Sequence, residues 1–400
     1  MNRAWWPVAL IVLAQWLGTS LWFSPNSAAD DLMAAWHIGA AEFAWLIAAT
    51  QAGFIAGTLG LAYAGWADRY STSRLFALSC VAGAAANGMF AAGEASFEAG
   101  LVLRLAVGMC LAGIYPLGMK MIVGWVGAKS GAALGVLVGM LTLGTALPHG
   151  VRAYGASWPW QTVVGASSML ALAGAALVYW LGDGPHLLRG QVRPGASVRR
   201  ALAVFRIPDF RAAALGYFGH MWELYAFWAV LPWLAVQWVQ DAHRFGGGAT
   251  LSVALISFMG IAAGFFGCVI GGRLSLRVGS AVVAGTALAS SGLLCLLYPV
   301  LPADWLGPRL AVLLAWGFFV VADSPQFSAI SARSCPPQSV GSALAIQNGI
   351  GFLITIVSIM VLLHFIDALG SAAVWILLPG PAFGLIGMWP LFRQKGKTNA

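Results

Sequence analysis

The chain has 400 residues, of which 60% are hydrophobic and only 8% are charged. An ordinary soluble domain contains about 25% charged residues, so these charges are too few to cover a water-soluble globule of this length. The composition therefore excludes a disordered chain, a cytosolic enzyme and a nucleic-acid-binding protein. We expect an all-α polytopic protein embedded in a lipid bilayer, and we interpret the excess of 21 Lys and Arg over 13 Asp and Glu as a signal of membrane topology.

Long apolar runs follow one another along the whole chain. A helix needs about 20 apolar residues to cross the bilayer core, and clusters of Pro, Gly and charged residues mark the breaks. Continuous runs favour helices over a β-barrel, because a helix satisfies its own backbone hydrogen bonds. Twelve spans are predicted, numbered in chain order: residues 5–27, 40–64, 75–93, 98–122, 131–150, 159–181, 210–238, 249–271, 280–300, 308–331, 341–365 and 372–392.

The positions of Lys and Arg predict the orientation of these spans. Basic residues collect in cytoplasmic loops, and alternate breaks hold most of them in this chain. We therefore predict that both termini and the basic central loop face the cytoplasm, and we expect no nucleic-acid partner for that loop. The exceptions on the other side are Arg104, Arg152, Arg244 and Arg309. The predicted domains are an N-terminal six-helix bundle (1–182), the inter-bundle loop (183–209) and a C-terminal six-helix bundle (210–400).

The two halves of the chain repeat each other at an offset of roughly 208 residues, and such periodicity indicates a duplicated structural unit. The loops after spans 2 and 8 are similar, and spans 4 and 10 each combine an early Arg with a later Pro. We therefore expect two pseudo-symmetric bundles of six helices. The aligned pairs include Gln15 with Glu223, Arg104 with Arg309, Pro116 with Pro325, and Gly131 with Gly341.

At these residues the chain resembles the major facilitator superfamily. The family's signature between spans 2 and 3, roughly G-x-L-x-D-R-x-G-R-[KR], matches at Asp68 and Arg69. Its R-x-x-x-G signature in span 4 matches at Arg104 and Gly108. The resemblance covers the whole chain in architecture, and it implies twelve transmembrane helices with both termini in the cytoplasm.

The resemblance also implies a conformational latch on the cytoplasmic side. In the family the Asp of this signature lies near the N-terminus of span 11, where the helix dipole favours a negative charge. Asp68 and Arg69 would form this latch and stabilise the outward-facing state. The copy after span 8 keeps Arg277 but has Leu276 in place of the Asp, so we expect one full latch.

Three charged residues lie away from the ends of predicted spans, where burial is costly and a functional role is the default hypothesis. They are Arg104, Glu223 and Asp323, and they fall on spans that line the central cavity in the resembled family. We predict that Glu223 carries a proton as access alternates, with Asp323 and the neighbouring His220 as further proton-coupling residues. The alternatives are a structurally paired Glu, an Asp that caps a bent helix, and a simple hydrogen-bonded His.

Polar and aromatic residues on the spans are candidates for contact with a solute. Arg104 could contact an anionic solute or a nearby acid, and the buried amides could equally well make hydrogen bonds between helices. The predicted substrate-binding residues are Arg104, Gln15, Trp16, Tyr225, Gln326, Gln51, Gln347 and Asn348.

Glycines recur at spacings of three or four residues in spans 2, 5 and 8, as at Gly53, Gly57 and Gly60. Small residues let helix backbones approach closely in a membrane. In the resembled family these spans belong to the seam between the halves. A sliding seam and static packing both explain the pattern.

The whole sequence predicts a secondary active transporter that moves a small organic solute across the bacterial inner membrane by alternating access, coupled to protons, as a monomer. It contains no GxxxxGKS phosphate-binding loop for ATP, no HExxH or GxSxG motif, and no CxxC pair, so we expect no metal site and no enzyme activity. The alternatives are an uncoupled facilitator, a polytopic membrane enzyme, and a sensor or scaffold that uses a transporter fold.

Overall fold

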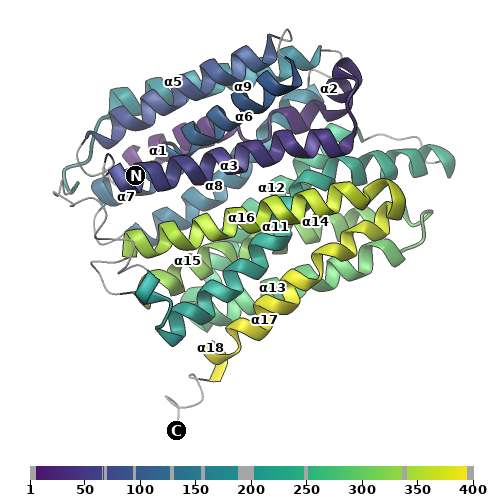
Figure 1. Ribbon diagram of the computed structural model, residues 1–400. Helices are drawn as coiled ribbons and strands as arrows, with labels where there is room; N and C mark the ends of the chain where they lie inside the picture. Colours follow the sequence, from purple (N-terminus) through teal and green to yellow (C-terminus); the bar gives the residue numbers. More distant parts are fainter. Residues whose placement is uncertain are drawn as a thin grey trace. The chain divides into compact units, whose positions relative to one another are not determined.

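A computed structural model shows a helical protein, and no β-strand occurs within the residues that it describes. The chain divides into two compact units, Met1–Gly195 and Ala196–Ala400; the boundaries predicted at 182 and 210 stay predictions. The helices of both units are labelled in Figure 1. The described residues are 6–64, 66, 70–92, 96–126, 130–154, 158–187, 202–246, 251–335 and 340–393.

Each predicted span falls on one helix or on consecutive helical segments, which confirms the all-α polytopic fold. Eight stretches of the described residues are long and apolar enough to cross a bilayer, and one of them, Ile346–Met388, covers both of the last two predicted spans. Unit 1 contains α1 (Trp6–Thr19), η1 (Pro25–Ala28), α2 (Ala29–Trp36), α3 (Ala40–Ala64), α5 (Thr72–Ala91), α6 (Phe97–Ala112), α7 (Tyr115–Val126), α8 (Ser130–Tyr154) and α9 (Trp160–Leu181). Unit 2 contains α11 (Pro208–Arg244), α12 (Val253–Val278), α13 (Ser280–Leu297), η3 (Tyr298–Val300), α14 (Leu306–Ala322), α15 (Ser324–Arg333), α16 (Val340–Leu369), η5 (Gly370–Leu377), α17 (Pro379–Met388) and α18 (Pro390–Arg393).

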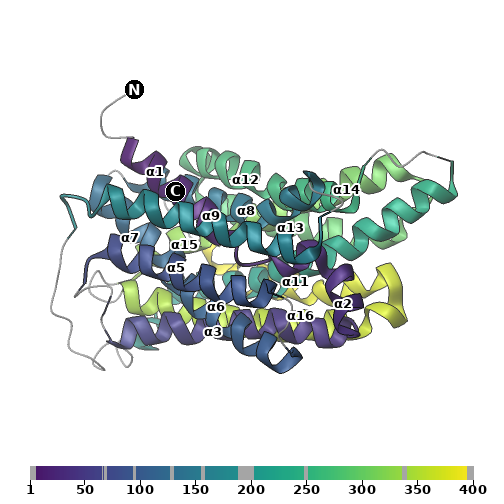
Figure 2. The same ribbon diagram turned by 90° about the horizontal axis from the view of Figure 1, so that it is seen from above.

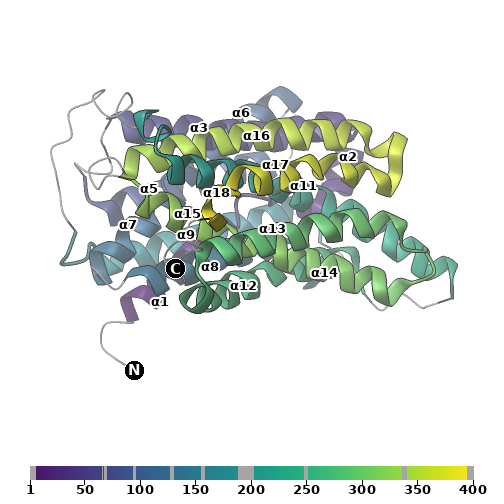
Figure 3. The same ribbon diagram turned by 90° about the horizontal axis from the view of Figure 1, so that it is seen from below.

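The same pairs of spans pack together in the two units. In unit 1, α3 packs on α6, α5 packs on α9, and α1 contacts both α8 and α9. Their counterparts in unit 2 are α12 on α14, α13 on α17, and α11 on α16 and α17. Figure 2 shows α3 beside α6, and Figure 3 shows α13 beside α14. This shared packing confirms the predicted pseudo-symmetric six-helix bundles.

Spans 1, 4, 10 and 12 are interrupted where the hydropathy is continuous, and span 12 consists of the segments η5, α17 and α18. Span 1 leaves the helix after Thr19 and resumes as η1 at Pro25. Span 4 is broken between α6 and α7, next to Pro116, and span 10 is broken at Asp323, next to Pro325. Proline has no amide hydrogen and clashes with the preceding turn, and each interruption is followed by a proline within the same span.

Pro325 cannot donate to the carbonyl of Val321 four residues earlier, and at the break this carbonyl accepts from the backbone N–H of Asp323 instead. The thiol of Cys268, on α12, donates to this carbonyl over 3.6 Å. Both residues are buried, where an unsatisfied carbonyl would be costly. The thiol therefore stabilises the interrupted helix from a neighbouring span.

Glycine lets helices touch within each unit. A Cβ on Gly53 of α3 would meet the Leu105 carbonyl of α6, and a Cβ on Gly267 of α12 would meet the Phe318 carbonyl of α14. These are the corresponding helix pairs of the two units. For these glycines the structure supports close packing inside a unit, and the sliding seam stays a prediction.

We predict that Gly53→Ala lowers the free energy of unfolding by about 1–3 kcal/mol, because the added methyl overpacks a backbone contact. The measurement is the melting temperature of the purified protein in detergent. Gly60→Ala, on the same helix, is the matched control, because a Cβ there has no neighbour within 4 Å. Equal melting temperatures for the two variants would contradict the packing.

Candidate functional site

The ionisable residues predicted for proton coupling and solute binding are buried in both units. Arg104 lies in unit 1, and His220, Glu223 and Asp323 lie in unit 2; each of these side chains is at most 1% exposed. The interactions recorded for each of them come from its own unit. The clusters are therefore built by helix packing within each bundle.

The guanidinium of Arg104 donates hydrogen bonds to three other spans of unit 1. Its Nε donates to Thr50 Oγ1 over 3.1 Å, and its Nη1 donates to Asn87 Oδ1 over 2.9 Å. Its Nη2 donates to the backbone carbonyls of Leu21 (3.1 Å) and Trp22 (2.7 Å), both in the interruption of span 1. Arg104 therefore connects its own span 4 to spans 1, 2 and 3.

Proline explains why the interruption needs this partner. Pro25 cannot donate to the carbonyl of Leu21. Arg104 supplies a donor in its place, and Ser24 Oγ lies 3.3 Å from the same oxygen as a further donor. Asn87 is held in turn, since Ser24 Oγ donates to its Oδ1 over 2.8 Å and its Nδ2 donates to Ser168 Oγ over 3.1 Å. The acceptors of Arg104 are neutral oxygens that a planar guanidinium can serve together. The predicted contact of Arg104 with a solute stays a prediction.

Glu223 accepts hydrogen bonds at both carboxyl oxygens. Ser291 Oγ of α13 donates to Oε2 over 2.8 Å, and the indole Nε1 of Trp316 on α14 donates to Oε1 over 2.7 Å. Trp316 is itself fixed against Phe227, with ring centroids 4.5 Å apart. Sequence reasoning missed Ser291 and Trp316, because no local pattern shows which neighbouring helix a carboxyl faces.

His220 lies next to Asp323 at the break in span 10. The imidazole Nδ1 is 2.8 Å from Asp323 Oδ1, and the rings of Tyr217 and Phe327 lie about 6 Å away, at 6.0 and 6.2 Å between centroids. His220 precedes Glu223 by three residues on α11, and the structure pairs its imidazole with the other acid, Asp323. The helix break thus brings a carboxyl from span 10 against span 7.

The glutamine side chains predicted to bind solute differ in their hydrogen bonding. Gln15 Nε2 donates weakly to the carbonyl of Leu137 over 3.4 Å. Gln51 and Gln347 are fully buried, and within the described residues their amide atoms make no hydrogen bond. Such groups are costly unless a solute or water binds them, so both remain suitable for ligand contact.

The other predicted solute-binding residues are spread over both units. Tyr225 is buried, with its ring 5.1 Å from those of both Trp228 and Phe352. Gln326 is also buried, whereas Trp16 and Asn348 are partly exposed.

The predicted latch is described only in part. Asp68 and Arg69 lie outside the described residues, and Arg277 is exposed near the end of α12. The role of all three residues stays a prediction.

Two ion pairs involve basic residues assigned to the non-cytoplasmic side. Arg152 pairs with Asp31 in unit 1, and Arg309 pairs with Asp241 in unit 2. The Arg309 guanidinium also lies 5.3 Å from the centre of the Tyr298 ring. Two of the four exceptions to the charge pattern, Arg152 and Arg309, thus have acidic partners that the sequence analysis did not assign.

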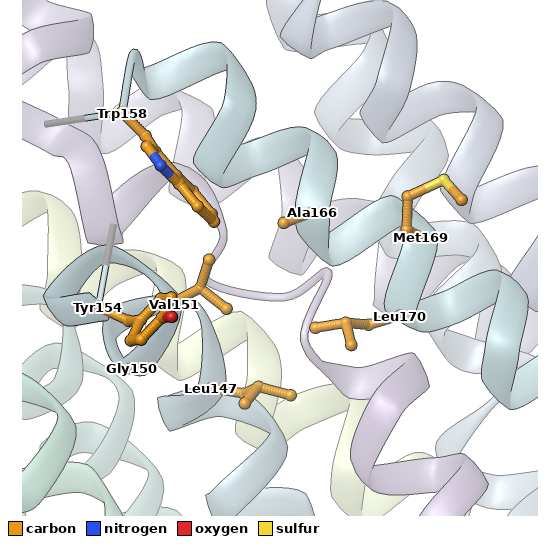
Figure 4. A pocket seen from close by; sticks show the side chains of 8 residues that line it. All are labelled: Leu147, Gly150, Val151, Tyr154, Trp158, Ala166, Met169 and Leu170. Carbon is orange, nitrogen blue, oxygen red and sulfur yellow. The ribbon is translucent and has the colours of Figure 1, made fainter. Parts of the chain in front are cut away.

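Two surface pockets in unit 1 lie apart from the ionisable clusters. One has about 550 Å³ and an apolar lining between α8 and α9, which Figure 4 shows. The other has about 570 Å³. Neither is lined by a predicted proton- or substrate-binding residue, and the described residues contain no cluster that could hold a metal ion. The second pocket is lined by Tyr70, Ser71, Ser73, Arg74, Tyr179, Gly182 and Asp183.

Two bundles with the same packing, apolar spans and buried ionisable clusters define a multi-pass membrane transporter. A family model described as Major Facilitator Superfamily matches residues 8–359. The chain belongs to the major facilitator superfamily, which favours a transporter of small molecules over a membrane enzyme.

Comparison with solved structures supports the same fold. A crystal structure of a mutant of the nucleoside transporter NupG matches with a TM-score of 0.71 and 12% sequence identity, over 97% of this chain and 99% of that chain. At this identity the similarity concerns the fold alone. Comparison with curated protein sequences finds no match.

We predict that Arg104→Lys destabilises the protein, because one ammonium group cannot serve all four acceptors of the guanidinium. Each buried acceptor left without a donor costs about 1–3 kcal/mol. The measurement is thermal unfolding in detergent. Arg244→Lys is the control, since Arg244 is exposed, and we expect it to change stability by less than about 0.5 kcal/mol. An Arg104→Lys variant as stable as the control would contradict the structural role of this cluster.

Proposed function

We propose that the protein is a proton-coupled secondary transporter that moves a small organic solute across the bacterial inner membrane by alternating access, as a monomer with both termini in the cytoplasm. The observation that carries this proposal is the cluster of His220, Glu223 and Asp323, buried together in unit 2. Family membership supports transport, and the cluster supports its coupling to protons.

Glu223 is suited to proton exchange because its two hydrogen-bond donors, Ser291 and Trp316, are neutral. An ionised carboxyl that is buried without a cation is costly. Binding a proton removes this cost, and contact with water during the cycle lets the proton leave. A change of access therefore becomes linked to a change of protonation.

The contact between His220 and Asp323 provides a second proton-binding group. Protonation of the imidazole turns this contact into an ion pair, and the contact joins span 7 to the break in span 10. A shift of either span would separate the two groups. Movement of either helix would therefore change the electrostatic interaction between His220 and Asp323.

Solute binding is assigned to polar groups on the spans. The buried amides of Gln51 and Gln347 offer both donors and acceptors to a polar solute, and Arg104 offers a positive charge. Aromatic faces such as that of Tyr225 suit a flat or apolar part of the solute. The proposed set also includes Gln15, Trp16, Gln326 and Asn348. Asp68, Arg69 and Arg277 are proposed as the latch.

An uncoupled facilitator is the second candidate. The complete hydrogen bonding of Glu223 favours it, since a satisfied buried carboxyl can serve packing alone. The two candidates differ in one property, which is whether a proton gradient drives accumulation of the solute.

We predict that Glu223→Gln abolishes proton-driven accumulation in proteoliposomes but retains exchange of labelled solute for unlabelled solute. The amide keeps the size of the carboxyl and its bonds to Ser291 and Trp316, but it cannot release a proton. A thermal-shift screen of metabolites first identifies a solute, and nucleosides are included because of the structural neighbour. Accumulation should fall to the level of protein-free liposomes.

Glu98→Gln is the control, because Glu98 is an exposed acid, and it should accumulate solute like the unchanged protein. Asp323→Asn is measured in parallel to separate the two acids. Full accumulation by both Glu223→Gln and Asp323→Asn would rule out coupling through these acids. Failure of Glu223→Gln to exchange solute would instead assign Glu223 to binding or folding.

A further inference from the structure

The hydroxyl of Ser291 lies between two acceptors. Its Oγ is 2.8 Å from Glu223 Oε2 and 3.0 Å from the backbone carbonyl oxygen of Leu288. A serine hydroxyl has one proton to donate and two lone pairs that accept. It can therefore donate to only one of these oxygens at a time.

The second hydrogen-bond partner of Glu223, Trp316, can only donate. The indole Nε1 of Trp316 is a donor only, and it lies 2.7 Å from Oε1. A proton on Oε1 would face this N–H and would remove its acceptor. The carboxyl proton is therefore best carried on Oε2, the oxygen that faces Ser291.

We propose that Ser291 is a positioning residue that gives Glu223 a hydrogen-bond partner in both of its protonation states. When Glu223 is ionised, Ser291 donates to Oε2. When Oε2 carries the proton, it donates to Ser291 Oγ, and the serine proton turns to the carbonyl of Leu288. Only hydrogen atoms move, so the contact between Glu223 of α11 and Ser291 of α13 keeps its heavy-atom positions in both states.

Burial makes this exchange of partners necessary. Ser291, Trp316 and Glu223 are all fully buried, so bulk water cannot replace a missing partner. A protonated carboxyl without an acceptor would lose a hydrogen bond in the low-dielectric interior. Ser291 thus allows proton uptake without that loss, and this inference rests on the proposed role of Glu223.

Other titratable groups on the surrounding helices have partners of their own. His220 on α11 contacts Asp323 at the α14–α15 break. The thiols of Cys268 on α12 and Cys295 on α13 donate to backbone carbonyls. The hydrogen bonds recorded at the Glu223 carboxyl thus come from Ser291 and Trp316 alone among the described residues.

Infrared difference spectroscopy of the full chain in lipid nanodiscs tests the inference without a solute. The acidic-minus-alkaline spectrum contains the carboxyl band of protonated Glu223, which is identified by its loss in Glu223→Gln. A carboxyl that donates no hydrogen bond absorbs at higher wavenumber than one that does. We expect Ser291→Ala to move this band to higher wavenumber, and Ser291→Thr to leave it in place because the hydroxyl remains.

Ser257→Ala is the matched control, because Ser257 is a buried serine of the same unit whose hydroxyl donates to the carbonyl of Val253. Its spectrum should show the unshifted band. A band that stays in place in Ser291→Ala, or moves equally in Ser257→Ala, would overturn the inference. A spectrum without any band that depends on Glu223 would also overturn it, since no proton would then be exchanged.

The infrared result and the transport result separate this inference from the proposed function. A shifted band in Ser291→Ala together with normal accumulation by Glu223→Gln would leave Ser291 as the partner of Glu223 and remove Glu223 from coupling. An unshifted band together with lost accumulation in Glu223→Gln would retain the coupling role and reject that of Ser291.

Discussion

A carbonyl inside a bilayer must find its hydrogen-bond donor within the protein, and this constraint shapes both clusters. Prolines remove the usual helical donors of the Leu21 and Val321 carbonyls. Nearby donors of the same spans, Ser24 and the Asp323 amide, and side chains from other spans serve them instead. Arg104 serves the first carbonyl with its guanidinium, and Cys268 serves the second with its thiol. Polar side chains therefore lie inside the bundle at the interruptions. The break in span 10 also places Asp323 against His220.

The duplicated architecture keeps its helix pairs while its chemistry diverges. The arginines of spans 4 and 10 each contact the first span of their own unit, yet Arg104 meets backbone carbonyls and Arg309 meets Asp241. At the position of Glu223, unit 1 has Gln15, an amide that binds and releases no proton. Packing is therefore shared between the units, whereas at this aligned position one unit has a carboxyl and the other has an amide.

Hydropathy was sufficient to predict the fold, since each span is an apolar run of bilayer length. The second span, for example, was predicted at the bounds that α3 has in the structure, Ala40–Ala64. It did not reveal the interruption of span 1, because the residues around Leu21 are as apolar as a continuous helix. Burial of Glu223 and Asp323 also follows from their places in such runs. The hydrogen-bond partners of these acids cannot be predicted from the sequence. Whether Glu223 faces Ser291 or another hydroxyl depends on how each helix is rotated and packed in the bundle.

The buried charges of the two units respond differently to an electric field. The guanidinium of Arg104 keeps its proton, so the membrane potential acts on unit 1 with the same sign throughout a transport cycle. Among the described residues, the acids buried in the spans belong to unit 2, and their charge depends on proton occupancy. In a cycle of the proposed kind, the voltage across the membrane therefore exerts a constant force on one repeat and a proton-dependent force on the other.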